Sequence, residues 1–185
     1  MRWLEVVGPP GVGKSALCDA LWPPRAIPGD REPPPLGWAT FIAVAAGLLQ
    51  RVAGHDSGNA CHSMFYRSLA KMTAVARRPG DQVYVQTGFA QRGLGIGWRL
   101  DDPERVRPYF EHMPLSVGVV FLEAPEAIVQ QRNRDRGKDR AWMVPKMRDS
   151  LAIAREVLEA RTAVSIIDTT EPIEECRARL ARCAV

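Results

Sequence analysis

The 185-residue sequence has few cysteines, histidines and lysines, and it lacks a long apolar stretch. Its four cysteines form no C-x-x-C pair, and its three histidines complete no metal motif with them. This spacing argues against both a zinc site and a disulfide framework. The longest nearly uncharged run, Trp38 to Gln50, is too short to cross a bilayer, so no membrane segment is expected.

The composition is that of an ordinary globular domain, with 46% hydrophobic and 25% charged residues. We expect a single domain spanning 1–185, without an internal repeat or a linker. Only four of the 25 basic residues are lysines, which leaves 21 arginines and a net charge of +4. An arginine excess suits recognition of phosphate or nucleic acid. A GC-rich genome would produce the same bias, so the charge alone does not identify a partner.

A glycine-rich motif near the N-terminus carries the strongest functional signal. Residues Gly8 to Ser15 match G-x-x-x-x-G-K-[ST] at every fixed position. The apolar run Trp3–Val7 before the motif predicts a buried strand, and Ala16–Leu21 after it has helical spacing. The first apolar segment therefore leads into this motif, and no signal peptide is expected. A chance glycine-rich turn would not require these flanking elements.

This arrangement predicts a P-loop that binds a nucleoside triphosphate, with ATP and Mg²⁺ as the expected cofactors. Backbone N–H groups would point at phosphate oxygens, aided by the positive end of the following helix. Lys14 would reach the β- and γ-phosphates, and the Ser15 hydroxyl would ligate the metal. The predicted nucleotide-binding residues of the motif are Gly8, Pro9, Pro10, Gly11, Val12, Gly13, Lys14, Ser15 and Ala16.

The rest of the chain alternates between predicted strands and helices. Strands are expected at 3–7, 82–86, 117–122 and 163–167, with a weak edge strand at 25–27 inside a proline-dense connection. Helices are expected at 16–21, 38–52, 60–78, 88–100, from 101, from 125 to 137, 144–161 and 171–183. This order favours an α/β fold with a parallel sheet covered by helices on both faces.

Three further segments follow the P-loop in a characteristic order. They are Phe121–Glu126 at a strand-to-helix turn, the arginines 132, 134 and 136 before Gly137, and Ile167–Pro172 after the last strand. With these segments the whole chain resembles the P-loop kinases of the nucleoside and nucleotide kinase group. The resemblance implies a three-layer P-loop NTPase sandwich with about five parallel strands in the order 2-3-1-4-5. It also implies an arginine-rich LID at about 132–145.

The LID resemblance assigns roles to two arginines on one helix face. Arg132 and Arg136 are four residues apart, so both would deliver positive charge to the phosphoryl group in flight. Arg134 and Arg140 are weaker candidates. In the same resemblance Arg132, Thr169 and Thr170 lie beside the adenine of the donor. The alternative is a solvated basic helix face paired with Glu126, Asp135 or Asp139.

The acceptor side resembles the Glu-Pro-x-x-x-Trp stretch of deoxynucleoside kinases, with one extra residue before Trp38. The resemblance places Asp30, Arg31, Glu32 and Trp38 in the acceptor pocket. Glu32 is the first candidate for the general base and Asp30 the second. A solvated charged loop explains both acids equally simply. Trp38 would either stack on a base or be buried at a helix start.

One position departs from the family pattern. The strand ending at Gln86 should carry an acid for the water shell of the metal, and glutamine adds no charge. Metal binding would then depend on Ser15 together with Asp30, Glu32 or Glu123. The remaining predicted acceptor contacts are Arg67, Gln86, Gln91 and Arg92.

These observations predict a kinase that phosphorylates a hydroxyl or phosphate of a nucleoside- or nucleotide-type acceptor. A narrower resemblance is to small phage kinases that phosphorylate 5-hydroxymethyluracil bases within DNA, an alternative that requires base flipping and a basic surface. Candidates for that surface are Arg77, Arg78, Arg99, Arg105 and Arg107. A regulatory ATPase without an acceptor is the alternative from another class. We expect a cytoplasmic location, in the host if the protein is phage-encoded; the sequence does not predict the oligomeric state.

Overall fold

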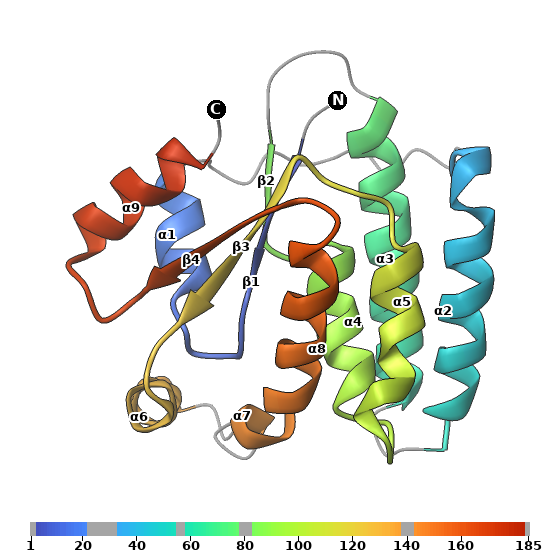
Figure 1. The fold of residues 1–185 in the computed structure, drawn as a ribbon. Helices are drawn as coiled ribbons and strands as arrows, with labels where there is room; N and C mark the ends of the chain where they lie inside the picture. The colour runs from blue at the N-terminus through green and yellow to red at the C-terminus, as the bar shows by residue number, and fades with distance from the viewer. Residues whose placement is uncertain (1–2, 22–32, 55–57, 78–82, 138–142, 184–185) are drawn as a thin grey trace.

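Four parallel strands form the central sheet of the protein. A computed structural model describes residues 3–21, 33–54, 58–77, 83–137 and 143–183 (Figure 1). The sheet has the order β2-β1-β3-β4, with the strands β1 (Trp3–Val7), β2 (Val83–Val85), β3 (Gly118–Glu123) and β4 (Ala163–Asp168). This order confirms the predicted arrangement of the four clear strands. The weak strand predicted at 25–27 lies outside the described residues, so the count of five stays a prediction.

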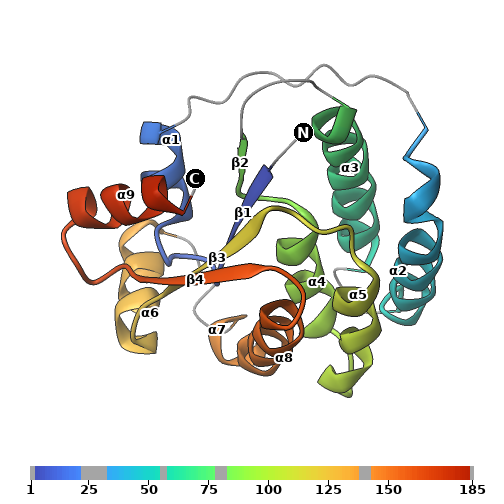
Figure 2. The same ribbon diagram turned by 45° about the horizontal axis from the view of Figure 1, so that its top comes forward.

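Helices cover both faces of this sheet (Figure 2). On one face lie α1 (Lys14–Leu21) and α9 (Ile173–Arg182), packed against each other. The other face carries α4 (Phe89–Gly97) and α8 (Arg148–Glu159), and a further group lies beyond them: α2 (Ala39–Arg51), α3 (Gly58–Arg77) and α5 (Arg107–His112). The remaining helical segments are η1 (Leu36–Trp38), η2 (Pro103–Val106), α6 (Glu126–Asp135) and α7 (Met143–Lys146).

One predicted helix is divided in two. The sequence predicts a continuous helix at 144–161, whereas the structure has the single turn α7 followed by α8. Pro145 lies within the four residues of α7, where a missing N–H costs least. The buried residue Met147 then caps α8 (φ −87°, ψ −8°). No helix in the described ranges is long and apolar enough to span a membrane.

Side-chain alternation along β1 divides the core into two clusters. Leu4 and Val6 face α1 and α9, whereas Trp3 and Val7 face the larger helical group. By the same alternation Glu5 points into that larger apolar cluster, and it is 0% exposed. A fully buried carboxylate at this position requires hydrogen-bond partners, which the site supplies.

An aromatic cluster fixes α4 against the outer helices. The Phe41 ring of α2 lies 4.7 Å from the ring of Phe89 and 5.0 Å from that of Tyr109, both edge-on. The buried Tyr109 hydroxyl donates a hydrogen bond to the Phe89 carbonyl oxygen at 3.0 Å. Helices α2, α4 and α5 are thereby joined at the first turn of α4, which lies beside the glycine-rich loop.

Candidate active site

The glycine-rich loop connects β1 to α1, and its residues Pro10, Gly11 and Gly13 line a cavity. Its glycines have positive φ angles, as expected for a loop that curls around an anion: +157° at Gly8, +87° at Gly11 and +107° at Gly13. Helix α1 begins at Lys14, so its N-terminus points into the same space. The structure thus confirms the predicted strand, loop and helix.

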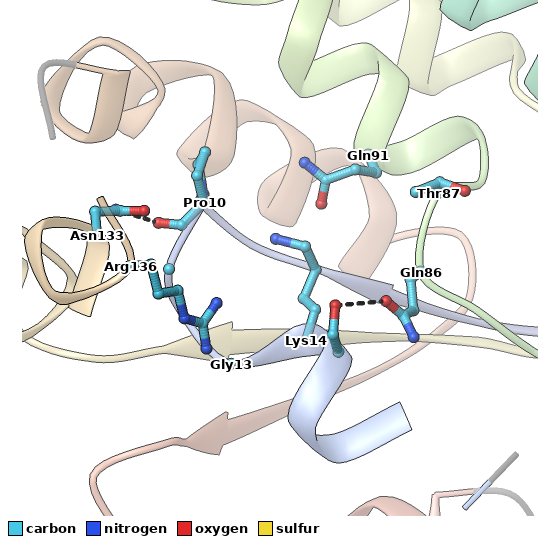
Figure 3. Close-up of a pocket in the computed structure, with 10 residues that line it drawn as sticks. Pro10, Gly13, Lys14, Gln86, Thr87, Gln91, Asn133 and Arg136 are labelled. Carbon is cyan, nitrogen blue, oxygen red and sulfur yellow. Dashed lines mark hydrogen bonds between the residues drawn. The ribbon is translucent and has the colours of Figure 1, made fainter. Parts of the chain in front are cut away.

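Lys14 lies across this loop with its ammonium group beside the cavity (Figure 3). Its Nζ donates to the carbonyl oxygens of Gly8 at 2.5 Å and Pro9 at 2.9 Å. Burial lowers the pKa of Lys14 to about 8, and the charge of Cys18 opposes this shift. An anion bound beside the ammonium group would restore its ordinary protonated form, so the position suits a phosphate ligand.

Ser15 and Gln86 approach each other at the edge of the cavity. The Ser15 hydroxyl donates to Gln86 Oε1 at 3.3 Å, and Gln86 directly follows β2 (Figure 3). Both side chains offer neutral oxygens, a donor type that Mg²⁺ accepts alongside phosphate oxygens and water. Among the described residues no group of three His, Cys, Asp or Glu side chains is placed to hold a metal. The two oxygens fit a metal that is bound mainly through its nucleotide.

Helix α4 contacts the loop through Gln91. The Gly8 amide donates to Gln91 Oε1 at 3.1 Å, which joins the start of the glycine-rich loop to the first turn of α4. Gln91 also lines the cavity opposite Lys14 (Figure 3). A predicted acceptor residue therefore also acts as a structural contact of the phosphate-binding loop.

Glu5 explains why α4 begins where it does. Its carboxylate accepts hydrogen bonds from the amides of Ala90 at 2.7 Å and Phe89 at 3.2 Å, and from the indole of Trp3 at 3.4 Å. Burial raises the pKa of Glu5 to about 7, although these hydrogen bonds and the Lys71 charge act in the opposite direction. A Cβ atom at Gly88 would lie 2.5 Å from the Glu5 carboxyl carbon, so glycine permits the close approach.

Helix α6 closes the cavity from the other side. Asn133 is buried, and its side-chain amide donates to the Pro10 carbonyl oxygen at 2.9 Å and to Val129 at 3.0 Å. A Cβ atom at Gly11 would lie 2.6 Å from the Asn133 amide nitrogen. The next turn brings Arg136 to the cavity wall, where its side chain points toward the loop (Figure 3).

Arg132 faces a different part of the site from Arg136. Its guanidinium donates to the Thr169 hydroxyl at 3.0 Å and to the Thr169 carbonyl oxygen at 2.8 Å. Thr169 in turn donates its amide to the Glu123 carbonyl oxygen at 2.8 Å. Thr170 is exposed, and both its amide and its hydroxyl donate to Asp168. Arg132 therefore holds the loop after β4 in place, and Arg136 is the arginine of this helix that lines the cavity.

The cavity has a volume of about 230 Å³, enough for a phosphate group and its surroundings. Its wall has cationic and neutral polar groups and includes no acidic side chain among the described residues. The lining residues are Pro10, Gly11, Gly13, Lys14, Ser15, Gln86, Thr87, Gln91, Asn133 and Arg136. The site therefore carries the charge expected of an anion-binding cavity.

The predicted acceptor residues are only partly brought to this site. Trp38 is 9% exposed and packs edge-on against Phe89 with ring centroids 5.2 Å apart, so it belongs to the core. Arg67 is exposed on α3, and Arg92 lies between α3 and α4. The base candidates Asp30 and Glu32, with Arg31 and Arg140, lie outside the described residues. Their roles stay predictions, as does the extent of the LID.

Two residues of the site escaped sequence reasoning. Glu5 stands between apolar neighbours in a predicted buried strand, and this isolated acid was the available signal. Asn133 lies between Arg132 and Arg134, and the sequence pattern there indicates a basic helix face and not a buried amide. Its position on the opposite edge of the helix from solvent becomes evident only from its contact with Pro10, 123 positions away.

Together, the parallel sheet, its strand order and the loop between β1 and α1 define a P-loop α/β fold. Solved structures of deoxyadenosine kinase from M. mycoides share this fold over 97% of each chain. With bound dCTP the TM-score is 0.54 at 9% identity, with the products dCMP and a flexible dCDP it is 0.57 at 10%, and with bound dATP it is 0.54 at 11%. Neither a family profile nor a curated protein matches the sequence.

Proposed function

We propose that this protein is an ATP- and Mg²⁺-dependent kinase that transfers a phosphoryl group to a hydroxyl or phosphate of a nucleoside- or nucleotide-type acceptor. The observation that carries the proposal is the cavity itself. Lys14, Ser15 and residues of the glycine-rich loop line it together with Arg136 from the end of α6. The fold shared with deoxyadenosine kinases supports the choice of acceptor class.

The donor would bind through its phosphates. The amides of the loop and the N-terminus of α1 would contact the β-phosphate, and Lys14 would exchange a carbonyl partner for a phosphate oxygen. Ser15 and Gln86 would hold the metal through their side-chain oxygens. When bound, Mg²⁺ would neutralise part of the negative charge on the β- and γ-phosphate oxygens.

Transfer would occur between Lys14 and Arg136. An acceptor oxygen forms a bond to the γ-phosphorus while the bond from the γ-phosphorus to the β–γ bridging oxygen breaks, leaving ADP. A hydroxyl acceptor loses its proton to a base, for which Glu32 and Asp30 remain the predicted candidates. Arg136 would stabilise the negative charge on the transferring group, and Arg132 would position the loop that carries Thr169.

Phosphoryl transfer from γ-labelled ATP tests this function. The acceptors are nucleosides, nucleoside monophosphates, and duplex DNA with or without 5-hydroxymethyluracil. Lys14→Ala should lower the rate roughly 10³-fold, the scale of losing a charge contact to a developing oxyanion. Lys146→Ala, on α7 and outside the cavity wall, is the matched control and should keep wild-type turnover.

The outcome also separates the alternatives. Release of labelled phosphate without transfer to any acceptor would overturn the kinase proposal in favour of a regulatory ATPase. Label entering only the modified duplex would identify the DNA kinase. For that alternative Arg107 offers little free charge, since it forms ion pairs with Glu104 and Glu156, both at 2.8 Å.

A further inference from the structure

Two cationic side chains lie together where α3 meets α4, beside the cavity. Arg92 Nε donates to the Ser68 hydroxyl at 2.7 Å, and its NH1 group contacts the Met64 sulfur at 3.4 Å. Lys71 Nζ lies 3.5 Å from the Thr87 hydroxyl. All of these partners are neutral. Within the described part of the chain, neither cation has a carboxylate at ion-pair distance.

Burial makes this arrangement unfavourable without a ligand. Both side chains are half-buried, and burial lowers the pKa of Lys71 and of Arg92. The second cause of the Lys71 shift is the charge of Arg92, so the two cations are close enough to repel each other. Arginine does not lose its proton in proteins, so the charge of Arg92 stays.

The buried acid Glu5 does not neutralise the pair. Glu5 is the one carboxylate whose charge favours the protonated form of Lys71 in the described structure. Its oxygens already accept hydrogen bonds from the amides of Phe89 and Ala90. Even with Glu5 ionised, two cations face one anion, and a positive charge remains. A half-buried positive charge that has hydrogen-bond partners but no compensating negative charge is typical of a site that binds an anion.

The position of the pair relates it to the transfer site. Thr87, the partner of Lys71, lines the cavity, as does Gln91 next to Arg92 in the chain (Figure 3). The pair therefore adjoins the cavity on the side of α3 and α4, and Arg136 approaches from α6. A ligand held there would be adjacent to the phosphates of the donor without occupying their loop.

We propose that Arg92 and Lys71, with the hydroxyl of Thr87, bind a phosphate group carried by the acceptor; Ser68, which accepts from Arg92 and donates to the Thr87 carbonyl oxygen at 2.9 Å, positions the arginine. The proposal rests on the kinase function proposed above and narrows its substrate class. The acceptor is then a nucleotide, either free or within a DNA strand, and not a free nucleoside. The remaining N–H groups of the guanidinium, the Lys71 ammonium and the Thr87 hydroxyl supply the donors to a tetrahedral anion.

Calorimetric binding in a Lys14→Ala background tests this site apart from the donor loop. The probes are deoxycytidine, dCMP and a single-stranded thymidine octanucleotide. At least one phosphate-carrying probe should bind ten times more tightly than deoxycytidine. Arg92→Gln should weaken that binding about 10- to 100-fold, the range for hydrogen bonds to charged groups. Arg51→Gln, an exposed arginine at the end of α2, is the control and should change nothing.

Lys71→Met provides a second variant in case Arg92→Gln does not fold. This variant should weaken phosphate binding because it removes a cationic donor. It should not lower the melting temperature, because it also removes the repulsion between Lys71 and Arg92. Tight binding by dCMP alone would identify a free nucleotide, and binding by the octanucleotide with a steep salt dependence would identify a DNA strand. Equal affinity for deoxycytidine and both phosphate probes, or unchanged affinity in both variants, would overturn the site.

Transfer from γ-labelled ATP then distinguishes this proposal from the function on which it rests. Suppose that label enters nucleosides as readily as nucleotides and that Arg92→Gln leaves the acceptor KM unchanged. The kinase function then stands, and the phosphate site is wrong. Conversely, Arg92-dependent binding of a phosphate probe in a protein that labels no acceptor supports the site and refutes the kinase. In the expected result Arg92→Gln raises the acceptor KM at least tenfold and leaves the KM for ATP unchanged.

Discussion

The buried carboxylate of Glu5 makes a sharp prediction for the variant Glu5→Gln. Glutamine keeps the size of the side chain but replaces one acceptor oxygen with an NH₂ group. One of the two amides at the start of α4, Phe89 or Ala90, then loses its acceptor in a fully buried position. Leaving such a group unsatisfied costs about 1–3 kcal/mol. At low pH the wild-type side chain is protonated, but its hydroxyl oxygen still has a lone pair for the second amide, which an NH₂ group lacks. We therefore expect the variant to be less stable than the wild type at low pH.

The cost should depend on pH, because only the wild type titrates at this position. Burial raises the pKa of Glu5 from 4.5 to about 7. The difference, 7 − 4.5 = 2.5, corresponds to about 3 kcal/mol at roughly 1.4 kcal/mol per pKa unit. The folded protein keeps this proton up to about pH 7, whereas the unfolded chain loses it near 4.5. The contribution of Glu5 to the free energy of unfolding is therefore largest below pH 4.5 and falls as pH rises to 7.

Urea unfolding of both proteins between pH 4.5 and 8, followed by far-UV circular dichroism, measures this effect. The difference between the two free energies of unfolding cancels the other titrating groups. The advantage of the wild type should shrink by about 3 kcal/mol across the range and vanish or reverse at pH 8. Glu111→Gln, exposed on α5, reports the effect of removing a surface carboxylate. A difference between wild type and Glu5→Gln that stays constant with pH would refute the reasoning.

Three further predictions follow from the same region. Gly88→Ala should cost about 1–3 kcal/mol in urea unfolding, because the new Cβ would overlap the Glu5 carboxyl group, and Glu5→Ala in the same chain should recover part of the loss; an unaffected Gly88→Ala protein contradicts this. Gln86→Glu keeps the acceptor for Ser15 and adds a charge, so the Mg²⁺ concentration for half-maximal activity should fall several-fold; no change would remove Gln86 from the metal site. Arg136→Ala should lower kcat roughly 10²-fold, because Arg136 lines the cavity, whereas Arg132→Ala should mainly raise the KM for ATP, because Arg132 holds Thr169. If the two variants change kcat and KM to the same extent, the two arginines do not have these different roles.

The parts that the sequence predicted are those with a short-range signal. The glycine spacing from Gly8 to Lys14 specifies a loop because positive φ angles are cheap only for glycine. The apolar strands β3 and β4 and the helices after them follow from local periodicity and turn residues. The predicted helix at 144–161 was wrong in its continuity, since the structure has the single turn α7 before α8 begins at Arg148.

The contacts that complete the site join positions far apart in the chain. Glu5 meets Ala90 across 85 positions, and Gly8 meets Gln91 across 83. Strand periodicity places Glu5 on the apolar face of β1 but does not reveal which backbone amides will satisfy it. For the same reason the sequence singled out the arginines of α6 and passed over Asn133, whose partner is a carbonyl in the loop.

The contact between Asn133 and Gly11 limits how this loop can be exchanged. The motif leaves the fourth position of the loop open to any residue, but here the Asn133 side chain fills the space that a Cβ atom would need. A loop grafted from another nucleotide-binding protein, with alanine or serine at that position, would collide with α6 even though it satisfies the motif. A protein carrying such a graft would also need a shorter side chain at position 133. The two segments are therefore interchangeable only as a pair, and a recombination boundary drawn between them would separate parts that fit only each other.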